Sequence, residues 1–156
     1  MPLHVRHHTA DDRHTLVSMN AAMALETEGV ELEPQRLTAG VQAVLDDPSK
    51  GFYLLAERDG ETIGQLMITT EWSDWRNGTF WWIQSVYVHP SHRRTGVYRA
   101  LYDWVLKQAE NRDDVCGVRL YVHHDNAAAT ATYSALGMMH SAYHLFEVDF
   151  VVDREV

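Results

Sequence analysis

Two strand-like runs with one helix-like run between them constrain this fold more than any other feature of the sequence. The first strand-like run covers residues 80–88, and the second covers residues 117–123. Between them, residues 96–110 carry apolar side chains at helical spacing. A helix that crosses between two neighbouring strands of one sheet leaves those strands parallel. The sequence therefore predicts a parallel strand pair joined by a crossover helix.

The strands before this pair follow a different pattern. The runs GFYLLAE and TIGQLMITT are separated by Asp59-Gly60, and Asn77-Gly78 precedes the strand-like run at 80–88. Asp-Gly and Asn-Gly dipeptides favour tight hairpin turns, so these three strands should be antiparallel neighbours. We expect an α/β (α+β) fold with a central mixed, mostly antiparallel sheet.

About four helices should flank this sheet. Thr9 and Asp12 match a capping box, and the helix that follows should run to about Glu26 and end at Gly29. Pro34 suits the first turn of a second helix.

The last part of the chain should add a helix and a strand. A short helix should begin near Asn126 and end at Gly137, which supplies a left-handed cap. The run YHLFEVDFVV, residues 143–152, should form the final strand. Because we find no repeat and no linker-like stretch, we expect a single domain over residues 1–156.

The composition narrows the class of partner. The chain has 13 basic and 22 acidic residues and a net charge of −9, which argues against nucleic acid. No apolar run reaches the roughly 18–20 residues that cross a bilayer, so we expect no membrane partner. The single cysteine and the lack of an apolar signal-peptide core at the N-terminus favour the cytoplasm.

The turn before the crossover helix, HPSHRRTG, has the features of an anion site. A helix N-terminus leaves backbone N–H groups unpaired and carries a partial positive charge. Arg93 and Arg94 add charge there, and Gly96 adds no side chain, so a pyrophosphate would suit the position. Neither the dinucleotide fingerprint nor the Walker loop is present in the sequence. Taken alone, the same residues could form an ordinary solvated turn.

A second segment, NAAATATYSALGM, places Asn126 and Tyr133 on one helical face, because seven residues are two turns. The small residues between them, Ala129 and Thr130, would let another group approach the helix closely. A tyrosine at such a position can have a purely structural hydrogen bond. It can also donate a proton to a leaving thiolate.

Together the two segments resemble the central motifs of the GNAT superfamily of acyl-CoA-dependent N-acetyltransferases. In that family a strand ending in V-x-P precedes [QR]-x-x-G-x-[GA] at a helix start, which VYVHPSHRRTGVYRAL matches at Arg93 and Gly96. The second segment resembles the family pattern N-x-x-A-x-x-x-Y-x-x-L-G-F at Asn126, Ala129, Tyr133, Leu136 and Gly137. The family prefers glycine or alanine where this chain has Tyr98, so that ring must point away from the cofactor groove or narrow it.

The resemblance implies acetyl-CoA as the acyl donor. The two parallel strands would splay apart near Val88, and the pantetheine arm would bond the main chain of Val86 and Val88. The pyrophosphate would lie at the first turn of the crossover helix, and Tyr133 would protonate the departing CoA sulfur. The cofactor-binding residues implied in this way are Val86, Val88, Arg93, Arg94, Thr95, Gly96, Val97, Tyr98, Arg99, Asn126, Ala129 and Tyr133.

The same resemblance places Gln84 where the family often has its general base. An amide cannot accept the proton, but it can order a water that does. Carboxylates that could serve instead are Glu26, Glu28, Glu71 and Asp74. We rank Glu26 first, because the first helix and the loop after it wall the acceptor cleft in the family.

Aromatic side chains could line that cleft. Trp72 and Trp75 flank a turn, and with Glu26 and Glu28 they could bind an acceptor ammonium through cation–π and charge interactions. Packing at the edge of the sheet would explain the two tryptophans equally well.

The resemblance thus implies transfer of an acetyl group from acetyl-CoA to a primary amine of a small molecule, by direct attack through a tetrahedral intermediate. Two alternatives stay open: a non-catalytic acyl-CoA-binding sensor, and a protein or peptide N-acetyltransferase. By analogy with the family, the final strand could form a homodimer. We expect no metal, because adjacent histidines on predicted strands, as in His123-His124, point to opposite faces.

Overall fold

Five strands form one mixed sheet in the order β1-β2-β3-β4-β5. The first four are antiparallel neighbours, whereas β4 and β5 are parallel. This confirms the predicted mixed, mostly antiparallel sheet and its one parallel pair. The strands of this computed structural model, which describes residues 2–153, are β1 (His4–His7), β2 (Phe52–Arg58), β3 (Glu61–Ser73), β4 (Gly78–Val88) and β5 (Val115–Leu120).

The chain divides into two units, one through Tyr121 and one from Val122 onward, and each is described by itself. The first unit holds the sheet with η1 (Ala10–Asp12), α1 (Arg13–Glu28), α2 (Pro34–Asp46), η2 (Pro90–His92) and α3 (Val97–Glu110). The second unit holds α4 (Ala127–Ala135). Within residues 2–153, no helix combines the length and the apolar character that a membrane crossing requires.

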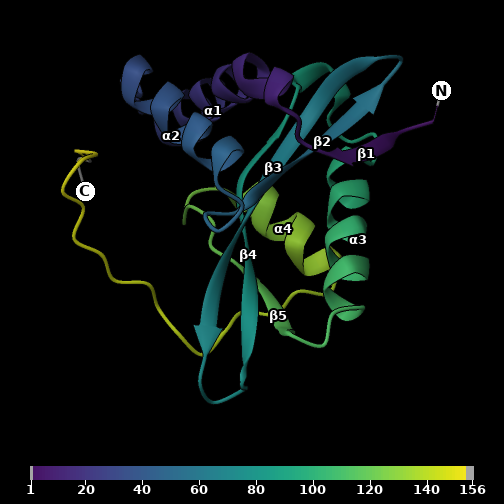
Figure 1. Ribbon diagram of the computed structural model, residues 1–156, viewed down its shortest axis with the longest axis vertical. Helices are drawn as coiled ribbons and strands as arrows, with labels where there is room; N and C mark the ends of the chain where they lie inside the picture. Colours follow the sequence, from purple (N-terminus) through teal and green to yellow (C-terminus); the bar gives the residue numbers. More distant parts are fainter. Residues whose placement is uncertain (1, 154–156) are drawn as a thin grey trace. The chain divides into compact units, whose positions relative to one another are not determined.

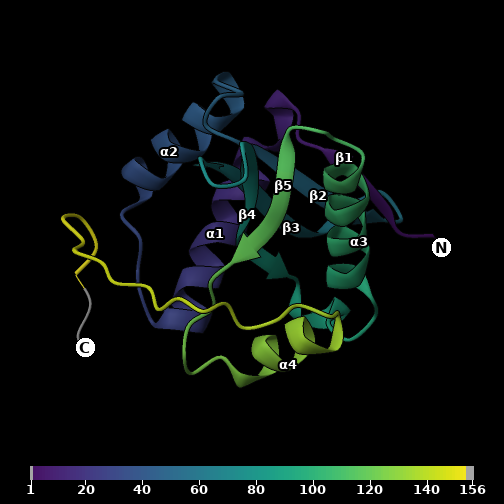
Figure 2. The same ribbon diagram turned by 90° about the horizontal axis from the view of Figure 1, so that it is seen from below.

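Helices cover both faces of the sheet (Figures 1 and 2). On one face, α1 and α2 enclose an apolar cluster with the sheet, whose buried members are Leu16, Val41, Val44, Tyr53 and Leu55. On the other face, α3 packs close to β3 at Gly64. A Cβ atom at Gly64 would lie 2.9 Å from a methyl group of Val97, so a larger residue there would push the helix away.

The predicted turns form as expected. Asp59 and Gly60 have φ values of 56° and 80° between β2 and β3, and Asn77 has a φ of 46° before β4. Gly29 ends α1 in the left-handed region, and its N–H bonds to the carbonyl groups of the last helical turn. Local sequence therefore specified the chain reversals and helix ends of the first unit.

Two strand predictions were wrong. The strand expected over residues 117–123 ends at Leu120, so His123 and His124 lie in a turn and not on a strand. The final strand expected over residues 143–152 is also absent, and apolar side chains there, such as Phe146 and Phe150, are more than 90% exposed. An alternating pattern favours extended backbone, but a strand also needs a neighbour for its hydrogen bonds. Residues 143–152 pair with no strand in the part of the chain that the structure describes.

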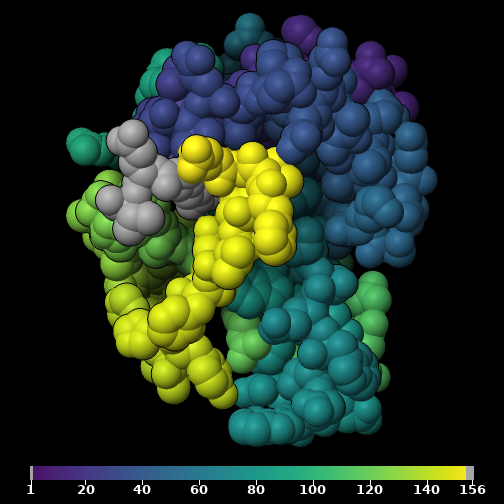
Figure 3. Space-filling view, turned by 90° about the vertical axis from the view of Figure 1, so that its left-hand side faces the viewer, coloured from purple at the N-terminus to yellow at the C-terminus, as the bar shows by residue number. Residues whose placement is uncertain are grey.

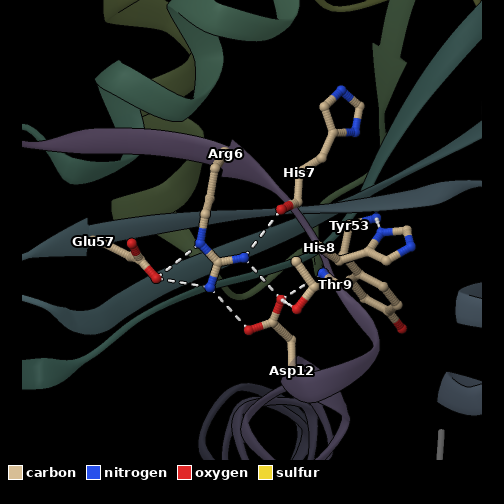
Figure 4. A network of polar contacts seen from close by, with 7 residues as sticks. All are labelled: Arg6, His7, His8, Thr9, Asp12, Tyr53 and Glu57. Carbon is tan, nitrogen blue, oxygen red and sulfur yellow. Dashed lines mark hydrogen bonds and ion pairs between the residues drawn. The ribbon is translucent and has the colours of Figure 1, made fainter.

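Arg6 links β1 to β2 and to the start of α1 through its side chain (Figure 4). Its guanidinium donates to Glu57 of β2 at 2.8 Å and to both carboxylate oxygens of Asp12, at 2.8 and 2.9 Å. The Asp12 carboxylate also accepts the Thr9 N–H at 2.6 Å, which is the capping interaction that the sequence predicts. One side-chain network therefore fixes the start of α1 against the edge of the sheet.

Replacement of Asp12 by asparagine should lower the free energy of unfolding at neutral pH by about 1–2 kcal/mol, because a charged hydrogen-bond partner is lost. The hydrogen bonds from Arg6 hold the pKa of Asp12 below its ordinary value. A lowered pKa stabilises the fold above the ordinary pKa of the carboxyl group, and this stabilisation is lost as pH falls through the folded value. Urea unfolding from pH 7 down to pH 2.5 should show that loss in the wild type and a shallower pH dependence in Asp12→Asn.

Asp11→Asn is the matched control, because Asp11 is the exposed neighbour of Asp12. It should change the free energy of unfolding little and keep the wild-type pH dependence. Equal effects of the two substitutions would contradict the role given to the Arg6 network.

Candidate functional site

A β-bulge interrupts β4 near its C-terminal end. Gln84 pairs with Met67, yet the next aligned pair is Tyr87 with Gln65, so β4 has one residue more than β3 in this interval. Ser85 lies in the bulge with a φ of 53°, in the left-handed region that glycine usually occupies. The bulge lies directly before the valines to which the sequence assigned pantetheine binding.

The far edge of β4 is open beyond the bulge. Pairing between β4 and β5 ends at Ile83 and Leu120, so within residues 2–153 no strand pairs with this edge over residues 84–88. His89 donates its N–H to Ile63 of the sheet at 2.8 Å. Because main-chain groups alternate along a strand, Val88 directs its own N–H away from β3, to the open edge. The two parallel strands β4 and β5 therefore separate after Ile83, five residues before the predicted position at Val88.

The turn into α3 leaves backbone N–H groups outside the hydrogen-bond ladder of the helix. Arg94 and Gly96 both have left-handed backbone, with φ values of 62° and 85°. Gly96 is the N-cap of α3, and no side chain caps the first turn. The first helical bond runs from Ala100 to Gly96 at 3.0 Å, so the N–H groups of residues 97–99 precede the ladder. This is the arrangement expected of an anion site.

Of the two arginines in this turn, Arg94 is the available cation. It is exposed, and its guanidinium has no polar partner among residues 2–153. Arg99 is also exposed and forms a 3.8 Å pair with Asp103, one turn along α3. Thr95 is held by a 2.6 Å bond from its hydroxyl to the His92 carbonyl.

The Tyr98 side chain packs against another residue of α3. Its ring stacks on Tyr102, with centroids 6.1 Å apart and an angle of 26° between the rings. Tyr102 is 5% exposed, so Tyr98 lies along the helix against a packed side chain. The departure from glycine or alanine at this position therefore has a structural explanation.

Arg93 lies in a clamp at the end of β4. Its Nε donates to the Val88 carbonyl at 3.0 Å, and its two terminal nitrogens bind both carboxylate oxygens of Glu26 at the end of α1. The guanidinium also lies over the Tyr87 ring, 5.7 Å from its centroid. These contacts use three of the five N–H donors of the guanidinium and direct it to Glu26 and Val88, and not to the first turn of α3.

The clamp changes the chemistry of Glu26. Its hydrogen bonds with Arg93 lower the pKa of the Glu26 carboxyl group and raise the pKa of Arg93. A carboxylate with a lowered pKa is a weaker base than an ordinary one. Both side chains are 41% exposed, so the pair is a geometric constraint more than a large source of stability.

Several of the residues predicted to contact an acceptor lie on or near the face of the sheet that α1 and α2 cover in part. The β3–β4 hairpin extends past these helices in Figures 1 and 3. Strand pairing places Gln84, Trp82 and Glu71 on the same face as Met67, which packs under α1 and α2. Gln84 donates to the Thr69 hydroxyl at 2.5 Å. An amide and a carboxylate thus lie on the same face of the sheet.

Two residues without an earlier assignment contact Glu71, and a third packs against one of them. Trp82 donates to its carboxylate at 3.3 Å, and Arg119 of β5 donates at 2.8 Å. The Tyr121 ring lies 5.7 Å from the Trp82 ring. Trp82 could have been found from the sequence, because it lies two residues before Gln84 on a strand.

The two tryptophans assigned to the acceptor are not grouped with Gln84. Trp72 pairs with Thr79, so alternation directs it to the opposite face of the sheet from Glu71. Trp75 lies in the hairpin turn and is 84% exposed, and Trp72 is 63% exposed.

The second unit carries the remaining predicted residues on α4. Asn126 is the N-cap, and its side chain accepts the Ala129 N–H at 3.1 Å. Tyr133 follows two turns later, and burial raises the pKa of its hydroxyl. Gly137 has a φ of 90° just after the helix, as predicted. The phenol of Tyr133 is therefore protonated throughout the neutral range.

One group of side chains in the second unit has spacing that could suit a metal ion. His123, His124 and Asp125 offer ligand atoms within 4.8 Å of one another. The two imidazole rings stack with centroids 4.5 Å apart, and they do not point to opposite faces as the strand prediction required.

Comparison with known proteins finds the same fold and one family. The acetyltransferase (GNAT) family matches residues 18–138. The crystal structure of a possible acetyltransferase from Clostridium difficile 630 is 39% identical in sequence to this chain. The match covers 97% of this chain and 99% of that protein, with a TM-score of 0.89. No curated protein matches the chain.

Two more distant structures share the fold alone. A predicted acetyltransferase from Clostridium acetobutylicum, solved with acetyl-CoA, is 19% identical, with 95% and 96% of the two chains covered and a TM-score of 0.76. A ribosomal-protein-alanine N-acetyltransferase from Brucella melitensis biovar Abortus 2308 is 17% identical, with 96% and 100% covered and a TM-score of 0.76.

Proposed function

Because this chain belongs to the acetyltransferase (GNAT) family, we propose that it transfers an acetyl group from acetyl-CoA to a primary amine of a small molecule. The observation that carries the proposal is the open edge of β4 beside the uncapped first turn of α3. An extended amide-containing arm can bond to such an edge as an added strand would. A pyrophosphate suits the neighbouring helix N-terminus.

The proposed donor site uses mainly main-chain groups. Val86 and Val88 would bond the pantetheine arm, and the N–H groups of the first turn of α3 would bind the pyrophosphate. Arg94 and Arg99 would supply positive charge, because Arg93 is committed to Glu26 and Val88. The other residues that we propose to contact the cofactor are Thr95, Gly96, Val97, Tyr98, Asn126, Ala129 and Tyr133.

In the proposed reaction the neutral amine attacks the thioester carbonyl carbon, and the electron pair of the C=O bond moves to its oxygen. The Val88 N–H would stabilise the resulting oxyanion. As the tetrahedral intermediate collapses, the C–S bond breaks and Tyr133 donates its proton to the departing sulfur. The amine loses one proton to solvent and solvent returns one proton to the Tyr133 phenolate, so one acetamide and one thiol leave the site and the enzyme is regenerated.

We propose that Glu26 positions Arg93 and does not itself accept the proton from the amine. Its carboxylate is already paired, and the pairing lowers its pKa. Gln84 lies on the acceptor face with its amide nitrogen bonded to Thr69, so its carbonyl oxygen is oriented and could hold a water that carries the proton away.

For the acceptor we propose a small molecule with a primary amine, which binds as an ammonium ion and loses a proton before it attacks. The Trp82 and Tyr121 rings offer cation–π attraction for it on the face that holds Gln84, and Glu71, whose charge is paired with Arg119, orients the Trp82 ring. Trp75 and Glu28 would contact more distant parts of the acceptor, whereas Trp72 faces the other side of the sheet and is left out of the proposed site. Homodimer formation through residues 143–152, a single domain over residues 1–156 and a cytoplasmic location stay predictions.

The test is acetyl-CoA turnover, measured as release of free thiol against panels of polyamines, amino acids, aminoglycosides and short peptides. Calorimetry would measure acetyl-CoA binding by the same preparation. We expect binding and turnover with at least one small amine, and no turnover without an amine.

The other outcomes separate the alternatives. Binding without turnover on any amine would favour a non-catalytic sensor. Turnover restricted to peptides would favour a protein N-acetyltransferase. An absence of acetyl-CoA binding would contradict the donor site itself.

A further inference from the structure

The bulge in β4 places Ser85, a residue with a side chain, in the left-handed backbone region that glycine favours. Ser85 has a φ of 53°, where a side chain is strained and glycine is not. Such a conformation persists only when surrounding contacts hold it.

Gln65 of β3 makes one such contact. Its side-chain nitrogen donates to the Ser85 carbonyl at 3.1 Å, from one strand to the next. Gln65 is 0% exposed, and the residue that pairs with it on β2, Leu55, is also fully buried. A carbonyl oxygen only accepts hydrogen bonds, so the NH2 group of Gln65, and not its oxygen, must face Ser85.

The burial of Gln65 is incompletely compensated. Its side-chain oxygen is buried and has no hydrogen-bond partner among residues 2–153. Buried polar groups are nearly always paired, because an unpaired group destabilises the fold. An apolar side chain at this position would avoid that penalty, so stability alone does not explain a glutamine here.

The extra residue determines which main-chain groups face the open edge. Gln84 and Tyr87 pair with residues on the same face of β3, although they are three positions apart. A regular strand would repeat every two positions, so removal of the bulge would shift the following residues by one and reverse their orientation. Val88 would then direct its N–H to β3 and not to the open edge.

We propose that Gln65 is a positioning residue for the acyl donor: its side-chain amide holds the Ser85 carbonyl, maintains the bulge and thereby keeps the Val86 and Val88 main chain on the open edge of β4. This role rests on the proposed function for its effect on catalysis. The effect on the β4 backbone itself does not depend on any activity.

The first test replaces Gln65 by methionine, which has a similar shape and no donor. We expect kcat/KM for acetyl-CoA to fall about 10–100-fold, since a small misplacement of reacting groups has effects of that size. The amide signals of Val86 and Val88 in nitrogen-15 NMR spectra of the enzyme without ligands should also shift. Ile68→Val, at another fully buried position on β3, controls for a general loss of core packing.

The second test uses Ser85→Gly as a rescue. Glycine adopts the left-handed conformation without a side-chain clash, so the bulge should depend less on Gln65 in that background. Gln65→Met should therefore reduce kcat/KM less in Ser85→Gly than in the wild type, and the Val86 and Val88 signals should return towards their wild-type positions.

The result that would overturn the proposal is an effect of Gln65→Met equal to that of Ile68→Val, with Val86 and Val88 signals unchanged. If Gln65→Met does not fold, the double variant with Ser85→Gly is compared with Ser85→Gly alone, and equal kcat/KM values and signals would overturn the proposal in the same way. If the wild type binds no acetyl-CoA, the proposed function fails, but the NMR comparison still decides whether Gln65 holds the bulge.

Discussion

Tyr133→Phe should lower kcat about 100-fold or more while acetyl-CoA still binds, because a general acid typically contributes a factor of this size. Burial raises the pKa of the Tyr133 hydroxyl, so the phenol keeps its proton at neutral pH and can donate it to the departing thiolate. Phenylalanine preserves the ring and removes only the proton donor. Steady-state thiol release together with calorimetric acetyl-CoA binding would measure both effects.

The direction of the pKa shift also predicts the pH dependence. A raised pKa keeps the acid form present at higher pH, so loss of the Tyr133 proton should reduce kcat only above pH 10, the ordinary pKa of the group. Tyr143→Phe is the control, because Tyr143 lies in the same unit and is 66% exposed. An unchanged kcat in Tyr133→Phe, or equal losses in both variants, would contradict the proposed proton donor.

Gly96→Val should raise the KM for acetyl-CoA about 10–100-fold, equivalent to the loss of one charge-assisted hydrogen bond to phosphate. Gly96 has a φ of 85°, which a β-branched side chain strongly disfavours, so the first turn of α3 must change its backbone. The N–H groups of residues 97–99 would then no longer converge on one anion. The KM for the amine should change much less.

Gly60→Val is the matched control for this substitution. Gly60 has a φ of 80° in the β2–β3 turn, and a Cβ atom at either glycine would meet no other atom within 4 Å. Both variants should therefore lose stability through the same backbone strain, but only Gly96→Val should weaken acetyl-CoA binding. Equal KM values for acetyl-CoA in the two variants would contradict a phosphate site in the turn before α3.

Features set by neighbouring residues could be predicted from the sequence. The turn before α3, the N-cap Asn126 and the left-handed Gly137 follow from local backbone chemistry, and the structure has each of them. The crossover from β4 to β5 followed from the pattern of strands and helix.

Features that join distant residues could not. Glu26 and Arg93 lie 67 positions apart, and nothing in either local sequence indicates that they pair. Gln65 and Ser85 meet only through strand register, which a bulge alters by one residue. Residues 143–152 have a strand pattern without a strand partner, because alternation specifies a preference of the chain and not its neighbour.

The contact between Arg93 and the Val88 carbonyl leaves Val88, at the end of β4, with an available hydrogen-bond donor and an acceptor that is already bonded. The carbonyl oxygen of Val88 already accepts a bond from Nε of Arg93, whereas its N–H points to the open edge. A molecule that docks at this residue therefore gains a hydrogen bond by presenting an acceptor atom there, and gains much less by presenting a donor. A thioester has an acceptor oxygen and no N–H, so the strand can distinguish the reactive end of an acyl donor from the amide bonds of its arm and fix the direction in which that arm lies.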